Sequence, residues 1–465
     1  MTNAYKRYWP VLIFILVMIT GLTVYRFKDQ DEEFRMSSVS PEQFSSYQHV
    51  TGVIDIHYWE NTVGIPVYFV KEDSLPFVDL QVIFDAGFAR DVDEMPIAHY
   101  TNFMLNQGTE KFNADQLAER LESIGAQYGA SVSRDTASVR LRSLSEPKTL
   151  STAATTLSDI LAHPVFDKKI LNREKNNGLT ALKHEQQTPG MIAERAFYET
   201  LYDKNPYGRM VLGTDTGIKG IKPAFLKKFH ETYYVQKNAK ICMVGDITLA
   251  QANALSEKIV QSLEPGQAPS PLTDVKRVAK PKFKKIAFKG QQAHIMAGMP
   301  LITRDDPDYF PLVVGMHVLG SNSQSNRIFD TIRGKHGLAY SAYGTVQPLQ
   351  VAGPMILSCQ TRADQANKAK DLLKSLLVDF IQEGPTSDEL TSAKQNLIGG
   401  YPLRFDSNRS ILIQLSVMAR YDYPLDYFNI YRENVDKVST EAIQEAFKRR
   451  VDPNQLSMIM VGGAK

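Results

Sequence analysis

One half of this chain repeats the other, and the repeat constrains the possible folds more than any other feature of the sequence. The strand-like run K-I-C-M-V-G at residues 240–245 has a counterpart, S-M-I-M-V-G, at residues 457–462, an offset of 217 positions. Three apolar pairs before these runs share that offset: Ile218 with Val435, Ile221 with Val438, and Leu226 with Ile443. A constant offset over about thirty residues predicts two copies of one fold, although a duplicated fold does not name a function.

Strand and helix patterns alternate along the first copy. Alternating or continuous apolar runs rich in β-branched and aromatic residues predict strands, and apolar residues recurring every three to four positions predict helices. The expected strands are 65–70, 77–84, 126–132, 137–142 and 240–245. The expected helices are 113–124, 146–162, 168–185, 192–202 and 249–263. This mixture predicts the α+β class, with two domains that are each an antiparallel sheet with helices packed on one side.

Composition divides the chain into segments. Residues 264–285 contain four prolines and a glycine, which is too broken for a core element, so we expect an interdomain linker there. The domains then span 51–263 and 286–465. Residues 29–50 are acidic and then rich in serine and glutamine, which predicts a polar tether, and residues 1–28 are expected to form an N-terminal membrane anchor.

The anchor prediction rests on residues 9–25, a run of 17 residues without a charge, which is at the short limit for a transmembrane helix. Aromatic residues border the run, and Lys6 and Arg7 precede it. A cleaved signal peptide is the alternative, but the run is followed by Arg26 and Lys28 and not by a small-residue cleavage site. We expect a bacterial inner-membrane protein with a single pass and its domains facing the periplasm.

Charge and cysteine content exclude some function classes. The net charge is only +2, and the one basic cluster, residues 276–289, is more simply a solvated linker, so we expect no nucleic-acid partner. Cys242 and Cys359 each lie inside an apolar run with no C-x-x-C spacing, so we expect two free, buried thiols.

The stretch M-P-I-A-H-Y-T-N-F-M-L-N-Q-G-T-E-K, residues 95–111, carries a recognisable motif. Its apolar spacing predicts a helix that Gly108 ends. The stretch resembles the helix that carries H-x-x-E-H in the M16 zinc peptidases, the inverzincins. His99 takes the place of the first histidine, whereas Asn102 stands where the general-base glutamate should be and Phe103 where the second histidine should be.

The substitutions remove the chemistry of that motif. Two histidines at i and i+4 share one helical face and can bind Zn²⁺, while the glutamate takes a proton from the metal-bound water. Asn102 cannot act as that base, and Phe103 has no lone pair for a metal. The resemblance places the third ligand, a glutamate, near Thr180, which is not acidic. We therefore expect no zinc in this chain, and His99 alone is more simply a hydrogen-bonded, partly buried imidazole.

A second motif, L-G-S-N-S-Q-S-N-R-I-F-D-T-I-R-G-K-H-G-L-A-Y-S-A-Y-G, spans residues 319–344. It is similar to the M16 stretch S-R-L-F-x-x-L-R-E-x-x-G-L-A-Y-S-V. The matching positions are Arg327, Phe329, Arg333, Gly337, Leu338, Ala339, Tyr340 and Ser341. The resemblance implies that Arg333 and Tyr340 hold substrate across a cavity from the zinc, and that in bacterial two-chain members one chain keeps the metal motif while the other keeps this pair.

The residues themselves allow that role. We expect Arg333 to end a short helix and Tyr340 to open a strand after a turn at Gly337, so that both side chains face one surface. A guanidinium and a phenol O–H can donate to a scissile carbonyl oxygen, whose negative charge grows in the transition state.

The leading hypothesis is a non-catalytic, zinc-less M16-like subunit that pairs as a heterodimer with an H-x-x-E-H subunit, which would carry the zinc. The pair would form a peptide-degrading chamber to which Arg333 and Tyr340 contribute. The first alternative is an inactive M16-like scaffold or peptide-binding protein of a membrane complex. The second is an autonomous metalloprotease with unrecognised ligands, although no two of the nine histidines lie within five positions of each other.

Overall fold

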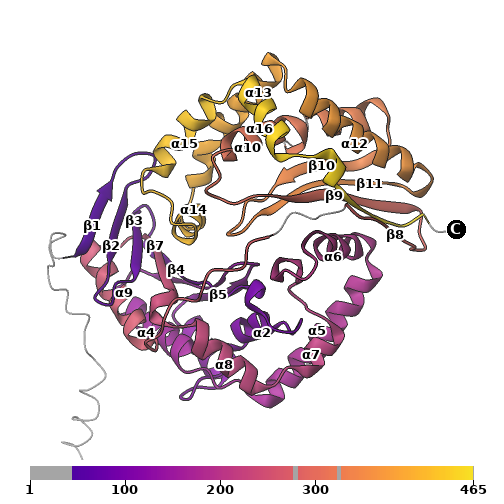
Figure 1. Cartoon of the computed structure of the whole chain (residues 1–465). Helices are drawn as coiled ribbons and strands as arrows, with labels where there is room; N and C mark the ends of the chain where they lie inside the picture. Colours follow the sequence, from indigo (N-terminus) through magenta and orange to yellow (C-terminus); the bar gives the residue numbers. More distant parts are fainter. Residues whose placement is uncertain (1–43, 276–280, 322–325, 464–465) are drawn as a thin grey trace, which may run out of the picture.

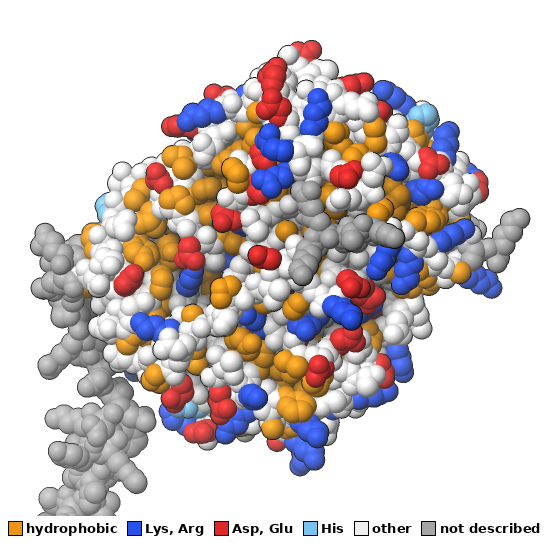
Figure 2. All heavy atoms as spheres, viewed as in Figure 1, with side chains coloured by type: hydrophobic (Ala, Val, Ile, Leu, Met, Phe, Trp, Pro, Cys, Tyr) orange, Lys and Arg blue, Asp and Glu red, His pale blue; other side chains and the backbone are white. Residues whose placement is uncertain are grey.

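The computed structural model describes residues 44–275, 281–321 and 326–463. The chain forms two lobes, each built around one sheet and a layer of helices (Figure 1). The first lobe, drawn in indigo to magenta, contains a seven-stranded sheet, and the second, drawn in orange to yellow, contains a five-stranded sheet. Figure 2 shows acidic and basic side chains interspersed over this face of the described residues, with no extended area of one sign.

The first sheet has the order β1-β2-β3-β7-β4-β6-β5. Its strands are β1 (Ser45–Val50), β2 (Ile56–Glu60), β3 (Pro66–Lys71), β4 (Phe77–Phe84), β5 (Gln127–Val132), β6 (Ala137–Leu144) and β7 (Ala239–Gly245). Every neighbouring pair is antiparallel except β3 and β7, which are parallel. The expectation of an antiparallel sheet is therefore wrong for this one pair. The two strands are far apart in the chain, and the long segment between them, which contains β4, β5, β6 and several helices, provides the crossover that a parallel pair needs.

The second sheet has the order β10-β11-β9-β12-β8. Its strands are β8 (Phe283–Ile286), β9 (Gln292–Ile302), β10 (Ala339–Val346), β11 (Gly353–Arg362) and β12 (Ser457–Val461). Read from β8, the order β8-β12-β9-β11-β10 matches β3-β7-β4-β6-β5 of the first sheet, and the corresponding pair β8 and β12 is again parallel. The repeat seen in the sequence is thus a repeat of sheet topology.

Each half also contains helices that pack on its own sheet or on one another. In the first half these are α2 (Ile97–Met104), α3 (Ala114–Glu122), α4 (Pro147–Ala162), α5 (Lys168–Gln187), α7 (Asp215–Gly220), α8 (Pro223–Tyr233) and α9 (Leu249–Ser262). In the second half they are α10 (Tyr309–Met316), α11 (Arg327–Phe329), α12 (Ala366–Glu383), α13 (Ser387–Gly399), α15 (Tyr427–Asp436) and α16 (Thr440–Arg450). Capping boxes begin α3, α9 and α13, which satisfies backbone N–H groups at their N-termini.

Shorter turns complete the chain. The 3₁₀ turns are Phe88–Arg90, Pro206–Gly208, Gln236–Asn238, Ala363–Gln365, Tyr401–Phe405 and Pro453–Gln455. Two π-helical segments, His317–Ser321 and Asp330–Lys335, lie in the second half.

One helix of each half packs on the sheet of the other half. α6 (Pro189–Tyr202) contacts β9 and β12 of the second sheet, and α14 (Asn408–Arg420) contacts β4 and β7 of the first. The side chains that α14 covers, among them Tyr68, Cys242 and Val244, are buried. The expectation of helices on one side only is therefore wrong, because the second face of each sheet is also apolar and must be covered.

A buried carboxylate also joins the two halves. Asp135 lies in the turn between β5 and β6 and is 1% exposed. It accepts hydrogen bonds from the Tyr207 hydroxyl of its own half and from three groups of the second half. These are the Arg420 guanidinium, the Tyr421 hydroxyl at 3.3 Å and the backbone N–H of Gln350 at 3.3 Å. The halves are thus linked by both packing and a hydrogen-bonded ion pair.

The structure corrects the expected membrane topology. None of the helices within residues 44–275, 281–321 and 326–463 is long and apolar enough to cross a membrane. The two longest, α5 and α12, carry charged residues along their whole length. On this finding the prediction of a single-pass inner-membrane protein is wrong for the part of the chain that the structure describes. The predicted periplasmic location depended on that membrane span and is corrected with it. The expected span, residues 9–25, lies outside the described residues.

The first described strand begins earlier than the folded chain was expected to begin. β1 starts at Ser45, inside the segment 29–50 that composition favours as a tether. Phe44 stacks on the buried Trp59 ring with centroids 5.5 Å apart, and β1 pairs with β2. This contact and the pairing order the end of that segment.

Candidate functional site

The degenerate metal motif lies on α2, which packs against α8 and the strands β5 and β6. His99 is half-buried. Burial lowers the pKa of its imidazole below the ordinary value, and the negative charge of Glu174 on α5 acts in the opposite direction. The Tyr100 hydroxyl donates to the Glu174 carbonyl at 3.3 Å, so α2 and α5 are adjacent here. His99 is therefore a neutral, partly buried imidazole near one carboxylate, and it is the one residue of the H-x-x-E-H pattern that this helix keeps.

The residue at the base position is built into the core. Asn102 is 2% exposed, and its side-chain N–H₂ donates to the Tyr234 hydroxyl at 3.1 Å and to the Ser138 carbonyl at 3.4 Å. It therefore joins α2 to β6 and to the residue that follows α8. Phe103, at the second-histidine position, is 37% exposed. Neither side chain can serve the chemistry of its counterpart in H-x-x-E-H.

The position expected for the third ligand also lacks a metal-binding side chain. The Thr180 hydroxyl donates to the Asn176 carbonyl one turn earlier in α5, at 3.0 Å, which is an ordinary bond within a helix. Among residues 44–275, 281–321 and 326–463, no group of three or more His, Cys, Asp or Glu side chains could hold a metal ion. Cys242 and Cys359 are both free and buried, as their apolar surroundings predict.

The second motif folds as its residues indicate. The Asn326 side chain accepts from the Phe329 backbone N–H at 2.8 Å and begins α11. The chain then widens into the π-helical segment Asp330–Lys335, which contains Arg333, and Gly337 follows with φ +58°. That left-handed conformation favours glycine and turns the chain into β10, where Tyr340 is the second residue.

Arg333 lies between two aromatic rings. Its guanidinium carbon is 4.9 Å from the ring centroid of Phe329 and 4.9 Å from that of Tyr340. One guanidinium N–H points to the Tyr340 carbonyl at 3.5 Å. Tyr340 is 84% exposed and Arg333 is exposed too, so both retain donors that face solvent. The sequence therefore correctly places the two side chains at one surface.

The neighbouring arginine of the motif has a different environment. Arg327 makes two hydrogen bonds of 2.7 Å to the Glu389 carboxylate and one of 2.9 Å to the Gly384 carbonyl. Its guanidinium also lies 5.1 Å from the ring centroid of Phe380. Arg327 thus ties α11 to the start of α13 and has little freedom to meet a ligand.

The structure keeps the two motifs apart. His99 and its degenerate neighbours belong to helices of the first half, whereas Arg333 and Tyr340 lie at the edge strand of the second sheet. They do not form one site within this chain.

The comparisons with known proteins agree with this architecture. A family model described as "Insulinase (Peptidase family M16)" matches residues 67–215, and one described as "Peptidase M16 inactive domain" matches residues 220–397. The crystal structure of a peptidase M16 inactive domain from Pseudomonas fluorescens is 30% identical, with a TM-score of 0.85 over 88% of this chain and 98% of that one. This chain belongs to peptidase family M16. The family resemblance and the two-sheet fold expected from it are confirmed.

Two further relatives of this M16 chain bear on function. The "non-peptidase homolog YmxG" of Helicobacter pylori is 26% identical over 416 residues, which are 88% of this chain and 94% of that protein. The periplasmic protease PqqL of Escherichia coli shares the fold, with a TM-score of 0.72 at 15% identity over 88% of this chain and 48% of that one. Together with the degenerate motif, the likeness to a non-peptidase homolog and to an inactive domain supports an M16 chain that is inactive by itself and holds no zinc.

The sequence did not reveal all the residues around these sites. Phe329 supports Arg333 from four positions earlier on the helix, a spacing that could have predicted the contact. Tyr234 and Glu174 are distant in sequence from the residues of α2 that they touch or influence, and no local pattern signals them.

Proposed function

We propose that this chain is the zinc-less subunit of a two-chain M16 peptidase and that Arg333 and Tyr340 bind the substrate in a chamber shared with an H-x-x-E-H subunit. The observation that carries the proposal is the guanidinium of Arg333 held between two rings while Tyr340 remains 84% exposed. An exposed arginine with no ion-pair partner among the described residues, yet fixed by stacking, is poised to meet a ligand.

The stacking has a consequence for catalysis. An arginine side chain loses much rotamer freedom when it binds, and contacts with two aromatic faces reduce that loss in advance. Donors that are already oriented stabilise a developing negative charge without reorganisation, which is the usual source of oxyanion stabilisation. The pair supplies donors only. The Lewis acid and the base would come from another chain, since this one lacks two of the three ligands and the glutamate.

The likeness to PqqL supports a chamber built from two such units. This chain covers 48% of that protease, so one M16 chain of this size corresponds to about half of it. We infer that a separate H-x-x-E-H chain supplies the other half, as a heterodimer, and that peptides are enclosed between them.

The second candidate is an inactive M16 scaffold that binds peptides or partner proteins without contributing to hydrolysis. The likeness to the non-peptidase homolog of Helicobacter pylori favours it. In this case the pair of Arg333 and Tyr340 would have no role in turnover.

The test starts from gentle purification of the tagged chain from its native cells. Co-purifying proteins are identified by mass spectrometry, and the material is assayed on a quenched fluorescent peptide with and without a zinc chelator. We expect an H-x-x-E-H partner and chelator-sensitive cleavage. Purification of the chain without a partner and without peptidase activity would favour the scaffold.

Matched variants then separate the two candidates. Arg333→Ala should retain the partner and lower kcat by about 10²-fold or more, which is the effect of losing one oxyanion donor. Lys335→Ala, which removes an exposed cation two positions later in the same segment, is the control and should leave kcat unchanged. Equal activity of the two variants would overturn the proposed role of Arg333.

A further inference from the structure

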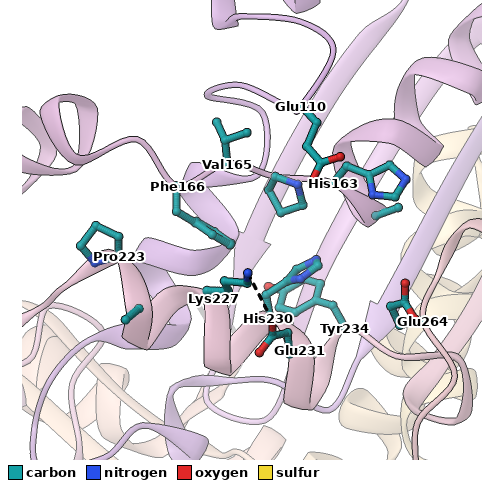
Figure 3. A pocket seen from close by; sticks show the side chains of 13 residues that line it. Glu110, His163, Val165, Phe166, Pro223, Lys227, His230, Glu231, Tyr234 and Glu264 are labelled. Atoms are coloured by element: carbon teal, nitrogen blue, oxygen red, sulfur yellow. Dashed lines mark ion pairs between the residues drawn. The ribbon is translucent and has the colours of Figure 1, made fainter.

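A pocket of about 660 Å³ opens in the first half between the end of α4 and the start of α8 (Figure 3). It lies away from the exposed pair of Arg333 and Tyr340, which belongs to the second half, and the proposed peptidase role makes no use of it. Its volume is within the range of about 300–1,000 Å³ typical of small-molecule sites.

Three rings, those of Phe166, His230 and Tyr234, line this pocket. The His230 ring stacks on Tyr234 with centroids 5.2 Å apart and meets Phe166 edge-on at 5.9 Å. Tyr234 is fixed from behind by the Asn102 side chain. Phe166 has φ +48°, a left-handed conformation that is uncommon and strained for a bulky residue. The Phe166 ring is thus placed at the pocket by a backbone conformation that is unfavourable for phenylalanine.

The charge of the pocket is negative. Three carboxylates, Glu110, Glu231 and Glu264, line it together with one ammonium, Lys227, which is 3.8 Å from Glu231. Figure 3 shows Glu110 above the His230 ring, Glu231 below it and Glu264 to its right in this view. The Glu110 and Glu264 side chains make no hydrogen bond or ion pair with any residue that the structure describes.

His230 does not offset this charge at neutral pH. Its Nε2 shares a hydrogen bond of 2.7 Å with the Leu161 carbonyl, so Nε2 carries the proton. Burial lowers the pKa of His230 below its ordinary value, so the imidazole is neutral and its Nδ1 is an acceptor. The pocket therefore combines aromatic faces, an imidazole acceptor and two carboxylates that have no cation of their own.

We propose that this pocket binds an organic cation, a primary ammonium or guanidinium group on an aliphatic stem. The cation lies between Glu110 and Glu264, and the stem packs on the rings, whose faces attract positive charge. Anions are excluded by the carboxylates. A bare metal ion is disfavoured, because no group of three metal-ligating side chains occurs among the described residues. The same chemistry has two sources, a free amine or a lysine or arginine side chain of a peptide.

Calorimetric titration of the full chain tests the proposal. The probes are agmatine and cadaverine as free amines and the capped peptide acetyl-Ala-Arg-Ala-amide as a side-chain source. The capped citrulline peptide, which has the same shape without the charge, is the neutral control. We expect binding of at least one cationic probe, weakened by added salt, and none of the citrulline peptide. A preference for the free amines or for the arginine peptide identifies the source.

Variants locate the binding. Glu110→Gln and Glu264→Gln each remove one charge at an exposed position, so the fold should be retained, and each should weaken binding by about tenfold. Glu119→Gln, an exposed acid on α3 outside the pocket, is the matched control and should bind as the parent does. Failure of every cationic probe, measurable binding of the citrulline peptide with the affinity of the arginine peptide, or unchanged binding of the cationic probe by both pocket variants would overturn the proposal. None of these outcomes tests the proposed role of Arg333 in substrate binding, so the two proposals can fail separately.

Discussion

The exchange of helices between the two halves predicts how the chain unfolds. Leu415 lies on α14, which belongs to the second half by sequence, but it is fully buried against the first sheet. Replacing Leu415 with alanine should therefore destabilise a sheet that lies more than a hundred residues away in the chain.

The structure sets the magnitude. Truncating a fully buried leucine removes its contacts and leaves a cavity, at a cost of about 2–5 kcal/mol. The site is enclosed by a rigid sheet on one side and by α14 on the other, so collapse into the cavity is limited and we expect about 3 kcal/mol. Ile413→Ala, two positions earlier in the same helix, is the control. Ile413 is 48% exposed, so its truncation should cost less than about 1 kcal/mol.

Urea unfolding can be followed separately in the first sheet. Trp59 on β2 is fully buried, and Trp9 is the only other tryptophan in the sequence. In a Trp9→Phe background, fluorescence reports the first sheet alone, while far-ultraviolet circular dichroism reports both halves. With m of about 3 kcal/mol/M or more for a chain of this size, the expected loss lowers both midpoints by about 1 M or less, and by the same amount.

Two results would refute this reasoning. If Leu415→Ala costs no more than Ile413→Ala, α14 does not cover the first sheet. If circular dichroism shows an early transition while the Trp59 midpoint is unchanged, the halves unfold independently.

The remaining predictions concern the motif, pH and metal. Arg333→Ala, which removes exposed ring contacts, should lower the free energy of unfolding by about 1 kcal/mol or less. Arg327→Ala, which breaks the bidentate pair with Glu389, should cost about 1.5–3 kcal/mol in the same urea assay. Because burial lowers the folded-state pKa of His230, the unfolded chain takes up the proton first, so stability is complete above the ordinary pKa of about 6.5 and falls as the pH drops below it. His230→Gln should reduce that loss between pH 8 and pH 5.5 in thermal unfolding, and an unchanged loss would contradict the assignment. Neither Zn²⁺ nor EDTA should move the Tm of the isolated chain, and a rise with stoichiometric zinc would revive an autonomous metal site.

Much of the fold could be predicted because it depends on local patterns. The apolar patterns at 146–162 and 249–263 predict α4 and α9 to within one residue of their observed bounds. The offset of 217 holds for whole elements, since α8 begins at Pro223 and α16 at Thr440. Such features depend on residues a few positions apart, which a single sequence displays directly.

The exchanged helices could not be predicted in the same way. The apolar face of α6, with Phe197 and Leu201 buried, predicts a helix with one covered side. It does not say which sheet covers that side, because a helix face fits either sheet equally well in pattern and size. The parallel pair of β3 and β7 was missed for a similar reason, since their partnership joins segments about 170 residues apart.

In the candidate site, too, local contacts could be predicted from the sequence and long-range contacts could not. Arg333 and Tyr340 lie on either side of one turn, so their spacing in the sequence was enough to predict that they share a surface. The environment of Asn102 could not be predicted, because its partner Tyr234 is 132 residues away.

The environment of Asn102 also indicates that restoring the three missing zinc-site residues would not by itself restore the zinc site. Asn102 donates from its amide to two oxygens in a site that is 2% exposed. Glutamate at this position would bring only acceptors when ionised, so it would face the Ser138 carbonyl without a donor and would lose solvation as well. The Tyr234 hydroxyl could donate to one carboxylate oxygen, but a buried negative charge with no cation beside it still costs several kcal/mol. The base position is now part of the packing between α2 and its neighbours. Position 102 therefore cannot supply a catalytic glutamate without a rearrangement of this packing.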